Sequence, residues 1–292
     1  MSTVILLAIT GVGLGAIYFL VACGLSLIYG LMGVLNFAHG VFLSLGAFLV
    51  FEISQRLGAT TWTGFAVSLL VGALAGAAFA AATERVLVQK LYNRHIEQVL
   101  VTVGLALAAV ALFDGIWGTD PRFISGPEWL GDTTMIAGAN VPNDRFVVII
   151  AAVAVLASIV LFLKHTRYGM IIRAGVENRS MVTALGIDVR TAFTLVFTIG
   201  GAAAGLGGVL ASHYFGYVSP LLGQTLLIFA FIVTVIGGLG SLVGAALASV
   251  TVALLQQFAN FYLEGTGDFA VVLLLAVVLL TRPSGLMGRK TI

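Results

Sequence analysis

The longest uncharged stretch of this chain, residues 191–263, contains no Asp, Glu, Lys or Arg, and a second such stretch covers residues 1–51. A helix that crosses the hydrocarbon core of a bilayer needs about 20 apolar residues, so the longer stretch has room for three crossings joined by tight turns. Backbone polar groups in hydrocarbon must be paired within the chain, and the apolar runs lack the alternation of a β-barrel. The pattern therefore predicts an all-α fold, a polytopic transmembrane helical bundle.

The composition supports this class and argues against others. Of the 292 residues, 60% are hydrophobic and 9% are charged, with a mean hydropathy of +1.12. An average soluble domain is about 45–50% apolar and about 25% charged. The net charge of +2 is too small to indicate a nucleic-acid partner, which needs clustered basic faces. The lone cysteine, Cys23, cannot form an internal disulfide.

Shorter uncharged stretches give the number of crossings. One crossing fits each of the stretches 57–83, 98–113, 146–163 and 269–281. Together with the two long stretches, they predict eight to ten crossings, with nine as the best value. We expect residues 1–292 to form a single transmembrane domain.

The distribution of basic residues predicts the orientation in the membrane. Most Lys and Arg residues fall in the segments 83–97, 164–190 and 282–290, and such segments stay on the cytoplasmic side. Segment 118–145 instead holds three prolines and more acidic than basic residues, so it is predicted to be an ordered outer loop. The N-terminus is then outside and the C-terminus inside, as an odd number of crossings requires.

Signatures of several catalytic classes are missing from the sequence. An ATP-driven pump needs the motif G-x-x-x-x-G-K-[ST], but no lysine of this chain follows a glycine. None of the four histidines precedes a glutamate, so the zinc motif H-E-x-x-H is absent as well. Paired acids within the apolar runs are also missing. We therefore predict a transport subunit without its own ATPase site, not an enzyme, with no metal or other cofactor bound by this chain.

Glycines interrupt two uncharged segments, 30–40 and 237–244. Transporters often place broken helices at corresponding positions of two halves, where free backbone groups line the path. Buried polar side chains such as those at 36 and 39 also need partners in a membrane. Tight turns at the cytoplasmic face are the alternative interpretation. The candidate path residues are Asn36, His39, Gly40, Gly238, Gly240 and Ser241.

The predicted cytoplasmic loop 164–190 contains a short amphipathic helix. Met181, Val182 and Leu185 give this helix an apolar side, and Gly186 is placed to end it as a left-handed C-cap. Such a helix either lies on membrane lipid headgroups or enters a groove on a partner protein. Both interpretations fit the composition of the loop.

The glycine-broken segment 29–40, with the sequence YGLMGVLNFAHG, is similar to the first-span signature of branched-chain amino-acid permeases of the LivH type, the LivH/LivM permease family. Further resemblances follow in order along nearly the whole chain, at residues 84–86, 166–169, 184–187, 237–241 and 282–286.

The resemblance implies the permease subunit of an ATP-binding-cassette (ABC) importer, a multi-pass protein of the bacterial inner membrane. Its cargo would be branched-chain or similar neutral amino acids, moved by alternating access. The implied partners are a second homologous permease subunit, two cytoplasmic ATPase subunits that bind ATP and Mg, and a periplasmic solute-binding protein. One alternative is the same machine carrying urea or short amides, and another is a stand-alone secondary carrier or channel. Residues implied to couple the chain to the ATPase are Arg173, Ala174, Glu177, Ala184, Leu185 and Gly186.

Overall fold

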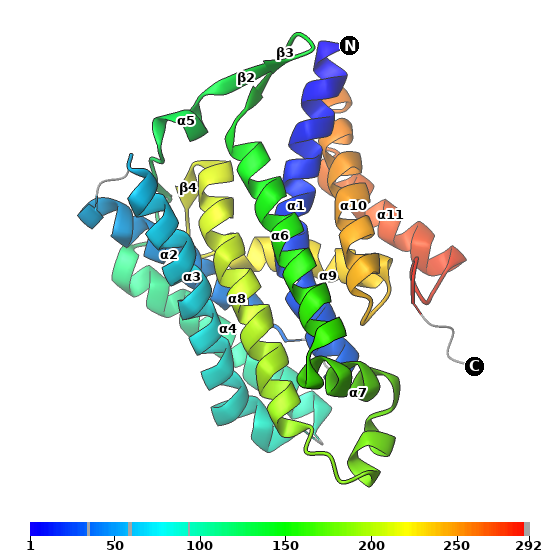
Figure 1. The fold of residues 1–292 in the computed structure, drawn as a ribbon. Coiled ribbons are helices and arrows are strands. Elements are labelled where there is room, and N and C mark those ends of the chain that lie inside the picture. The colour runs from blue at the N-terminus through cyan, green and yellow to red at the C-terminus, as the bar shows by residue number, and fades with distance from the viewer. Residues whose placement is uncertain (34–35, 58–59, 93, 289–292) are drawn as a thin grey trace.

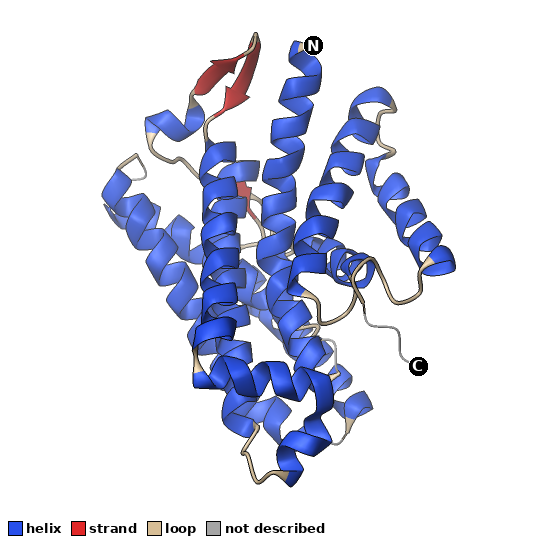
Figure 2. Ribbon diagram, turned by 45° about the vertical axis from the view of Figure 1, so that its right-hand side comes forward, coloured by secondary structure: helices blue, strands red, loops and turns tan. Residues whose placement is uncertain are grey.

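The computed structural model describes residues 1–33, 36–57, 60–92 and 94–288. Helices make up most of this part of the chain, and the strands are short (Figures 1 and 2). The predicted helical membrane fold is thus confirmed, with two small antiparallel strand pairs added to it.

The elements follow one another along the chain as a series of long helices with short connections. The helices are α1 (Ser2–Met32), α2 (His39–Leu57), α3 (Trp62–Thr83), α4 (His95–Trp117), α5 (Glu128–Gly131), α6 (Asp144–His165), α7 (Arg167–Ala184), α8 (Arg190–Phe215), α9 (Leu222–Gly237), α10 (Leu242–Tyr262) and α11 (Gly267–Thr281). The paired strands are β1 (Arg122–Phe123) with β4 (Tyr217–Val218), and β2 (Thr133–Ile136) with β3 (Ala139–Pro142).

Within the described residues, six helices are long and apolar enough to cross a membrane. They are α1, α3 with its continuation, α4, α6, α8 and α10. The apolar helices α9 and α11 are shorter: the 16 residues of α9 span about 24 Å, less than the hydrocarbon core. The count of eight to ten crossings and the outward N-terminus stay predictions.

The charge pattern predicted that the second uncharged crossing segment, 57–83, ends at residue 83, but the helix extends to Leu91. Helix α3 continues beyond residue 83 through a π-turn, η1 (Glu84–Val88), and a 3₁₀ turn, η2 (Gln89–Leu91). Glu84 is fully buried and accepts hydrogen bonds from the hydroxyls of Tyr92 and Thr194. These two hydrogen bonds satisfy the carboxylate of Glu84, so this residue is accommodated inside the bundle and does not lie in a loop.

The two loops that were predicted to face opposite sides lie at opposite ends of the bundle. The N-terminus lies beside the β2–β3 hairpin at one end, α7 lies at the other, and α6 connects them (Figure 1). The loop 118–145 is ordered by Asn143, whose amide donates to the Trp129 carbonyl (2.9 Å) and accepts from the Thr134 hydroxyl (2.5 Å).

Glycines let the central helices touch through their backbones. A β-carbon at Gly205 of α8 would collide with the Gly72 carbonyl of α3, and one at Gly208 with the Leu43 carbonyl of α2. In lipid there is little hydrophobic drive between helices, so close packing of small residues holds them together. Helix α8 therefore forms the centre around which α2 and α3 pack.

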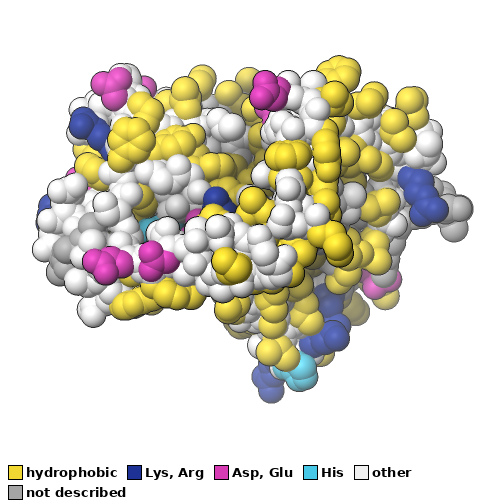
Figure 3. Space-filling model, turned by 90° about the horizontal axis from the view of Figure 1, so that it is seen from above, with side chains coloured by type: hydrophobic (Ala, Val, Ile, Leu, Met, Phe, Trp, Pro, Cys, Tyr) yellow, Lys and Arg dark blue, Asp and Glu magenta, His cyan; other side chains and the backbone are white. Residues whose placement is uncertain are grey.

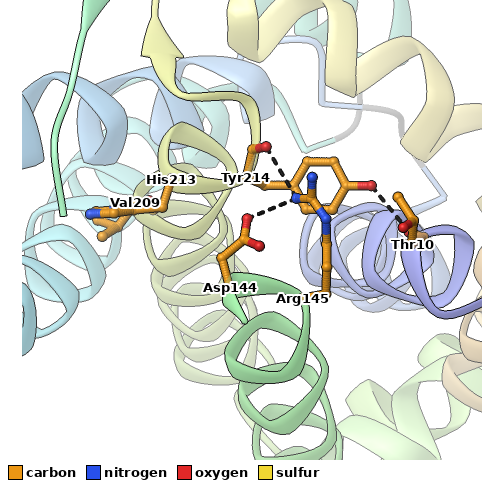
Figure 4. A network of polar contacts seen from close by, with 6 residues as sticks. All are labelled: Thr10, Asp144, Arg145, Val209, His213 and Tyr214. Carbon is orange, nitrogen blue, oxygen red and sulfur yellow. Dashed lines mark hydrogen bonds and ion pairs between the residues drawn. The ribbon is translucent and has the colours of Figure 1, made fainter. Parts of the chain in front are cut away.

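One polar network joins α6, α8 and α1 near the end of the bundle that carries the hairpin (Figure 4). The Arg145 guanidinium donates to the Asp144 carboxylate (2.8 Å) and to the Tyr214 carbonyl (3.1 Å), and it lies 3.4 Å from the centre of the Tyr214 ring. The Tyr214 hydroxyl in turn donates to the Thr10 carbonyl (3.1 Å). Because Asp144 and Arg145 are largely buried, each neutralises the other's charge away from water.

We predict that Gly205→Ala lowers the free energy of unfolding by about 1–3 kcal/mol, since the added methyl overpacks the contact with α3. Gly104→Ala in α4 is the matched control, because a β-carbon there meets no atom within 4 Å, and it should be neutral or stabilising by up to about 1 kcal/mol. Denaturation in mixed SDS micelles, followed by circular dichroism, gives both values. Equal effects of the two substitutions would contradict the packing described here.

We also predict that Arg145→Met costs about 3–5 kcal/mol, because it leaves the Asp144 carboxylate buried and unpaired. The double variant Asp144→Asn/Arg145→Met removes both charges and should recover part of this loss. The same unfolding experiment, run as a double-mutant cycle, measures the coupling. A double variant that loses the sum of the two single losses would show that the pair does not interact.

Candidate translocation path and coupling surface

Helices α2 and α9 begin next to each other within the bundle. A β-carbon at Gly40 would lie 2.6 Å from the Gly223 carbonyl oxygen, so the first turns of the two helices touch through their backbones. Ser44 holds this junction, because its hydroxyl accepts a hydrogen bond from the Gly223 amide (3.1 Å) and donates one to the Pro220 carbonyl (3.3 Å). Helix N-termini leave amides without helical partners, and here nearby groups pair several of them: the Gly223 amide donates to Ser44 and the Leu222 amide donates to the Ser219 carbonyl.

His39 joins the start of α2 to the middle of α1. Its side chain is fully buried, and its Nε2 lies 3.1 Å from the Val21 carbonyl oxygen. Space for the ring comes from Gly24, where a β-carbon would lie 2.7 Å from the ring and 2.6 Å from Gly200 of α8. The second ring nitrogen has no partner among the described residues. In this conformation His39 acts as a structural hydrogen-bonding residue between α2 and α1.

Asn36 forms the turn that leads into α2 and also faces α4. Its side-chain oxygen accepts a hydrogen bond from the Ala38 amide (3.0 Å). Together with Gln98 and Thr102 of α4, it lines a small cavity. The Asn36 side-chain nitrogen and the Gln98 side-chain oxygen are buried without a partner in the described part of the chain. Polar groups therefore line the contact between the start of α2 and α4.

The second glycine-interrupted segment forms the turn between α9 and α10. Gly238 and Gly240 have φ values of 99° and 83°, which only glycine adopts without strain. The Ser241 hydroxyl accepts from the Gly244 amide (3.0 Å) and so caps the start of α10. Gly240 also touches α1, since a β-carbon at Gly30 would lie 2.9 Å from its Cα atom. The two interrupted segments thus meet at Gly30 and Gly240.

The predicted path residues fall into two groups at opposite ends of α9. One group, Asn36, His39 and Gly40, surrounds the start of α2, and Gly40 touches the start of α9. The other group, Gly238, Gly240 and Ser241, follows the end of α9. The length of α9, about 24 Å, separates Gly40 from the second group.

Sequence reasoning missed two sets of contacts at this site. The contacts of Ser44 were not predicted, because this serine lies in an uncharged segment and no sequence motif distinguishes it from other serines. The segment after α11 pairs the last carbonyls of α9, because the Leu286 amide donates to the Ile236 carbonyl (2.8 Å) and the Met287 amide to the Gly237 carbonyl (3.1 Å). The Pro-Ser-Gly sequence 283–285 signals the end of a helix, but not the place where the following chain packs.

The predicted amphipathic helix is the second part of a longer, broken helix. Helix α7 has a non-helical residue, Asn178 (φ −156°, ψ 93°), whose side chain accepts from the amide three residues later (3.0 Å). At the other end Gly186 has φ 77°. Its amide donates to the Thr183 carbonyl (3.0 Å), and the Ile187 amide donates to the Val182 carbonyl (3.4 Å). These two bonds form a Schellman motif, so the predicted left-handed cap at Gly186 is confirmed.

An apolar pair is exposed on this part of α7. Met181 and Leu185 are four residues apart and are 61% and 69% exposed, whereas Val182 is buried. Residues at this spacing lie on one face of a helix, and exposed apolar pairs of this kind fit a groove on a partner. The predicted coupling residues are all at the surface: Arg173, Ala174, Glu177, Ala184, Leu185 and Gly186.

Residues 7–281 of this chain match the family described as the permease component of branched-chain amino acid transport systems. The high-affinity branched-chain amino acid transport system permease protein LivH of Escherichia coli K12 is 27% identical over 97% of this chain and 94% of its own length. BraD of Pseudomonas aeruginosa, named in the same way, is 28% identical over 97% of this chain and 95% of its own length. LivM of E. coli K12 is 23% identical over 93% of this chain and 68% of its own length. No solved structure matches significantly.

The family match begins within α1 and ends at the last residue of α11, so it contains both interrupted segments and the whole of α7. It agrees with the resemblance found in the sequence motifs. The chain belongs to the family of branched-chain amino acid transport permeases.

Proposed function

We propose that this chain is the permease subunit of an ABC importer that moves branched-chain or similar neutral amino acids across the bacterial inner membrane. The observation that carries the proposal is the match of residues 7–281 to a permease family whose similar members are named as branched-chain amino acid permeases. The energy would come from ATP and Mg bound by two cytoplasmic ATPase subunits. This chain contributes the path and the contact with the ATPase.

The junction of α2 and α9 supports a path for a solute without net charge. Its groups are backbone amides and the hydroxyl of Ser44, with no charged residue from 191 to 263 or from 1 to 51. A zwitterionic amino acid carries no net charge, so it needs no fixed counter-ion. In this proposal Asn36, His39 and Gly40 shape the start of α2, while the turn 238–241 shapes the far end of α9.

A chain of direct contacts supports coupling between α7 and the path. A β-carbon at Gly175 of α7 would lie 2.6 Å from the Leu31 side chain, and one at Gly30 would lie 3.5 Å from the Val176 side chain and 2.9 Å from Gly240. Movement of α7 would therefore reach the end of α1 and the turn between α9 and α10 together. The exposed pair Met181 and Leu185 would contact the ATPase.

The opposite end of the bundle would receive the periplasmic solute-binding protein. Figure 3 looks down on this end and shows acidic side chains scattered among hydrophobic ones. Asp120, Glu128 and Asp132 of the loop 118–145 are exposed. The second permease would be a LivM-type subunit or a second copy of this chain, since proteins of both names resemble it.

Purification in mild detergent from the native membrane, followed by uptake assays in proteoliposomes with the co-purified subunits, tests the proposal. ATP-dependent leucine uptake that excess isoleucine inhibits and urea does not is the expected result. Inhibition by urea or a short amide instead would change the cargo. Uptake by the chain alone, driven by an ion gradient and indifferent to ATP, would overturn the proposal in favour of a secondary carrier or channel.

We predict that Leu185→Asp reduces ATP-dependent uptake by at least about tenfold, because it brings an unpaired carboxylate into the apolar contact with the ATPase. Leu185→Met is the matched control, since it keeps an apolar side chain at this exposed position, and it should transport normally. Uptake and ATP hydrolysis are measured on the same proteoliposomes. Normal uptake by the Asp variant would exclude a docking role for this face of α7.

A further inference from the structure

A large cavity lies where α11 diverges from the bundle. Figures 1 and 2 show α10 and α11 joined at one end and separating towards the end of α11. The cavity has a volume of about 1040 Å³ and is lined by residues from α1, α9, α11 and the segment after α11. Pockets for small molecules measure about 300–1,000 Å³, so this one is large for a single amino acid.

The wall of the cavity combines one cation, hydroxyl groups and an apolar surface. Arg282 is its charged residue, and it has no carboxylate within 4.0 Å in the described part of the chain. Tyr29 and Ser284 add hydroxyls, while Val235 and Leu279 belong to the apolar part. The lining contains no Asp or Glu. An amino acid would find no acidic partner here for its ammonium group, whereas a net anion is complementary to this charge.

The position of the cavity fits a ligand that comes from the membrane. Arg282 directly follows α11, so it lies where an apolar helix ends. Helix α11 also exposes Val272, Leu273 and Leu280, as expected for a helix that faces lipid. Basic pockets between membrane helices, near the ends of the spans, bind anionic lipid headgroups.

We propose that this cavity binds an anionic phospholipid, with the phosphate at Arg282 and an acyl chain along Val235, Leu239 and Leu279. The hydroxyls of Tyr29 and Ser284 supply further donors to the headgroup. The lipid fills the space between α9 and α11 and lies against the segment 284–288, whose amides pair the last carbonyls of α9. This site is independent of the cargo and of the proposed transport function.

Titration of the delipidated, detergent-solubilised full-length chain with phosphatidylglycerol, followed by native mass spectrometry, tests the proposal. We expect saturable binding of about one phosphatidylglycerol per chain and markedly weaker binding of phosphatidylcholine. Arg282→Gln should weaken phosphatidylglycerol binding about fivefold, the effect expected for one basic residue near a lipid headgroup. Lys90→Gln is the charge control, since Lys90 is exposed on η2 and does not line the cavity.

A second pair of variants tests the apolar part of the site. Leu279→Trp fills part of the cavity and should reduce binding, while Leu280→Trp, at the neighbouring residue that is 86% exposed, should not. Equal binding of both lipids, or unchanged binding by Arg282→Gln and Leu279→Trp, would overturn the proposal. Displacement of the phospholipid by leucine would also overturn it, because the cavity would then be part of the path. So would cross-linking of the Leu279→Cys variant through residue 279 to a co-purified polypeptide in native membranes.

Discussion

Direct backbone contact between helices, at positions where neither partner has a side chain, is the constraint on which this structure depends. Gly24 touches Gly200, Gly30 touches Gly240, and Gly40 touches Gly223. Hydrocarbon supplies little hydrophobic force between helices, so stability comes from such close packing. These contacts also decide where polar groups lie, because His39 fits beside α1 only where Gly24 leaves room. The candidate path and the core of the bundle therefore share the same residues.

The sequence was sufficient for features that depend on local chemistry. Uncharged runs predict helices in a membrane, and the glycine at 186 predicts a left-handed cap, because both follow from a short stretch of chain. The buried Glu84 could not be predicted in this way. Its partners, Tyr92 and Thr194, come from separate parts of the chain. A prediction that ends each crossing at the first charged residue assigns every Asp and Glu to a loop.

In the candidate site, too, the sequence predicts local features but not the contacts between residues that are far apart in the chain. The glycines at 238 and 240 indicate a turn, and the structure has one there. The start of α9 beside α2 was not predicted, because it depends on the pairing of Ser44 with Pro220 and Gly223, far apart in the sequence. The break in α7 at Asn178 was missed because a single asparagine is compatible with either a helix or a cap. Tertiary contacts, not propensity, decide these cases.

The glycine contacts at the two ends of α9 bear on how the bundle can change shape. Gly40 meets Gly223 at one end, and Gly30 meets Gly240 just beyond the other. At these points the helices meet backbone to backbone, so a change in their crossing angle moves few large side chains past one another. Interlocked large side chains would resist such pivoting, because packed interiors shift between discrete arrangements. At the start of α9 the Ser44 hydrogen bonds would resist such tilting, so the contact between Gly30 and Gly240 is the less constrained of the two pivots.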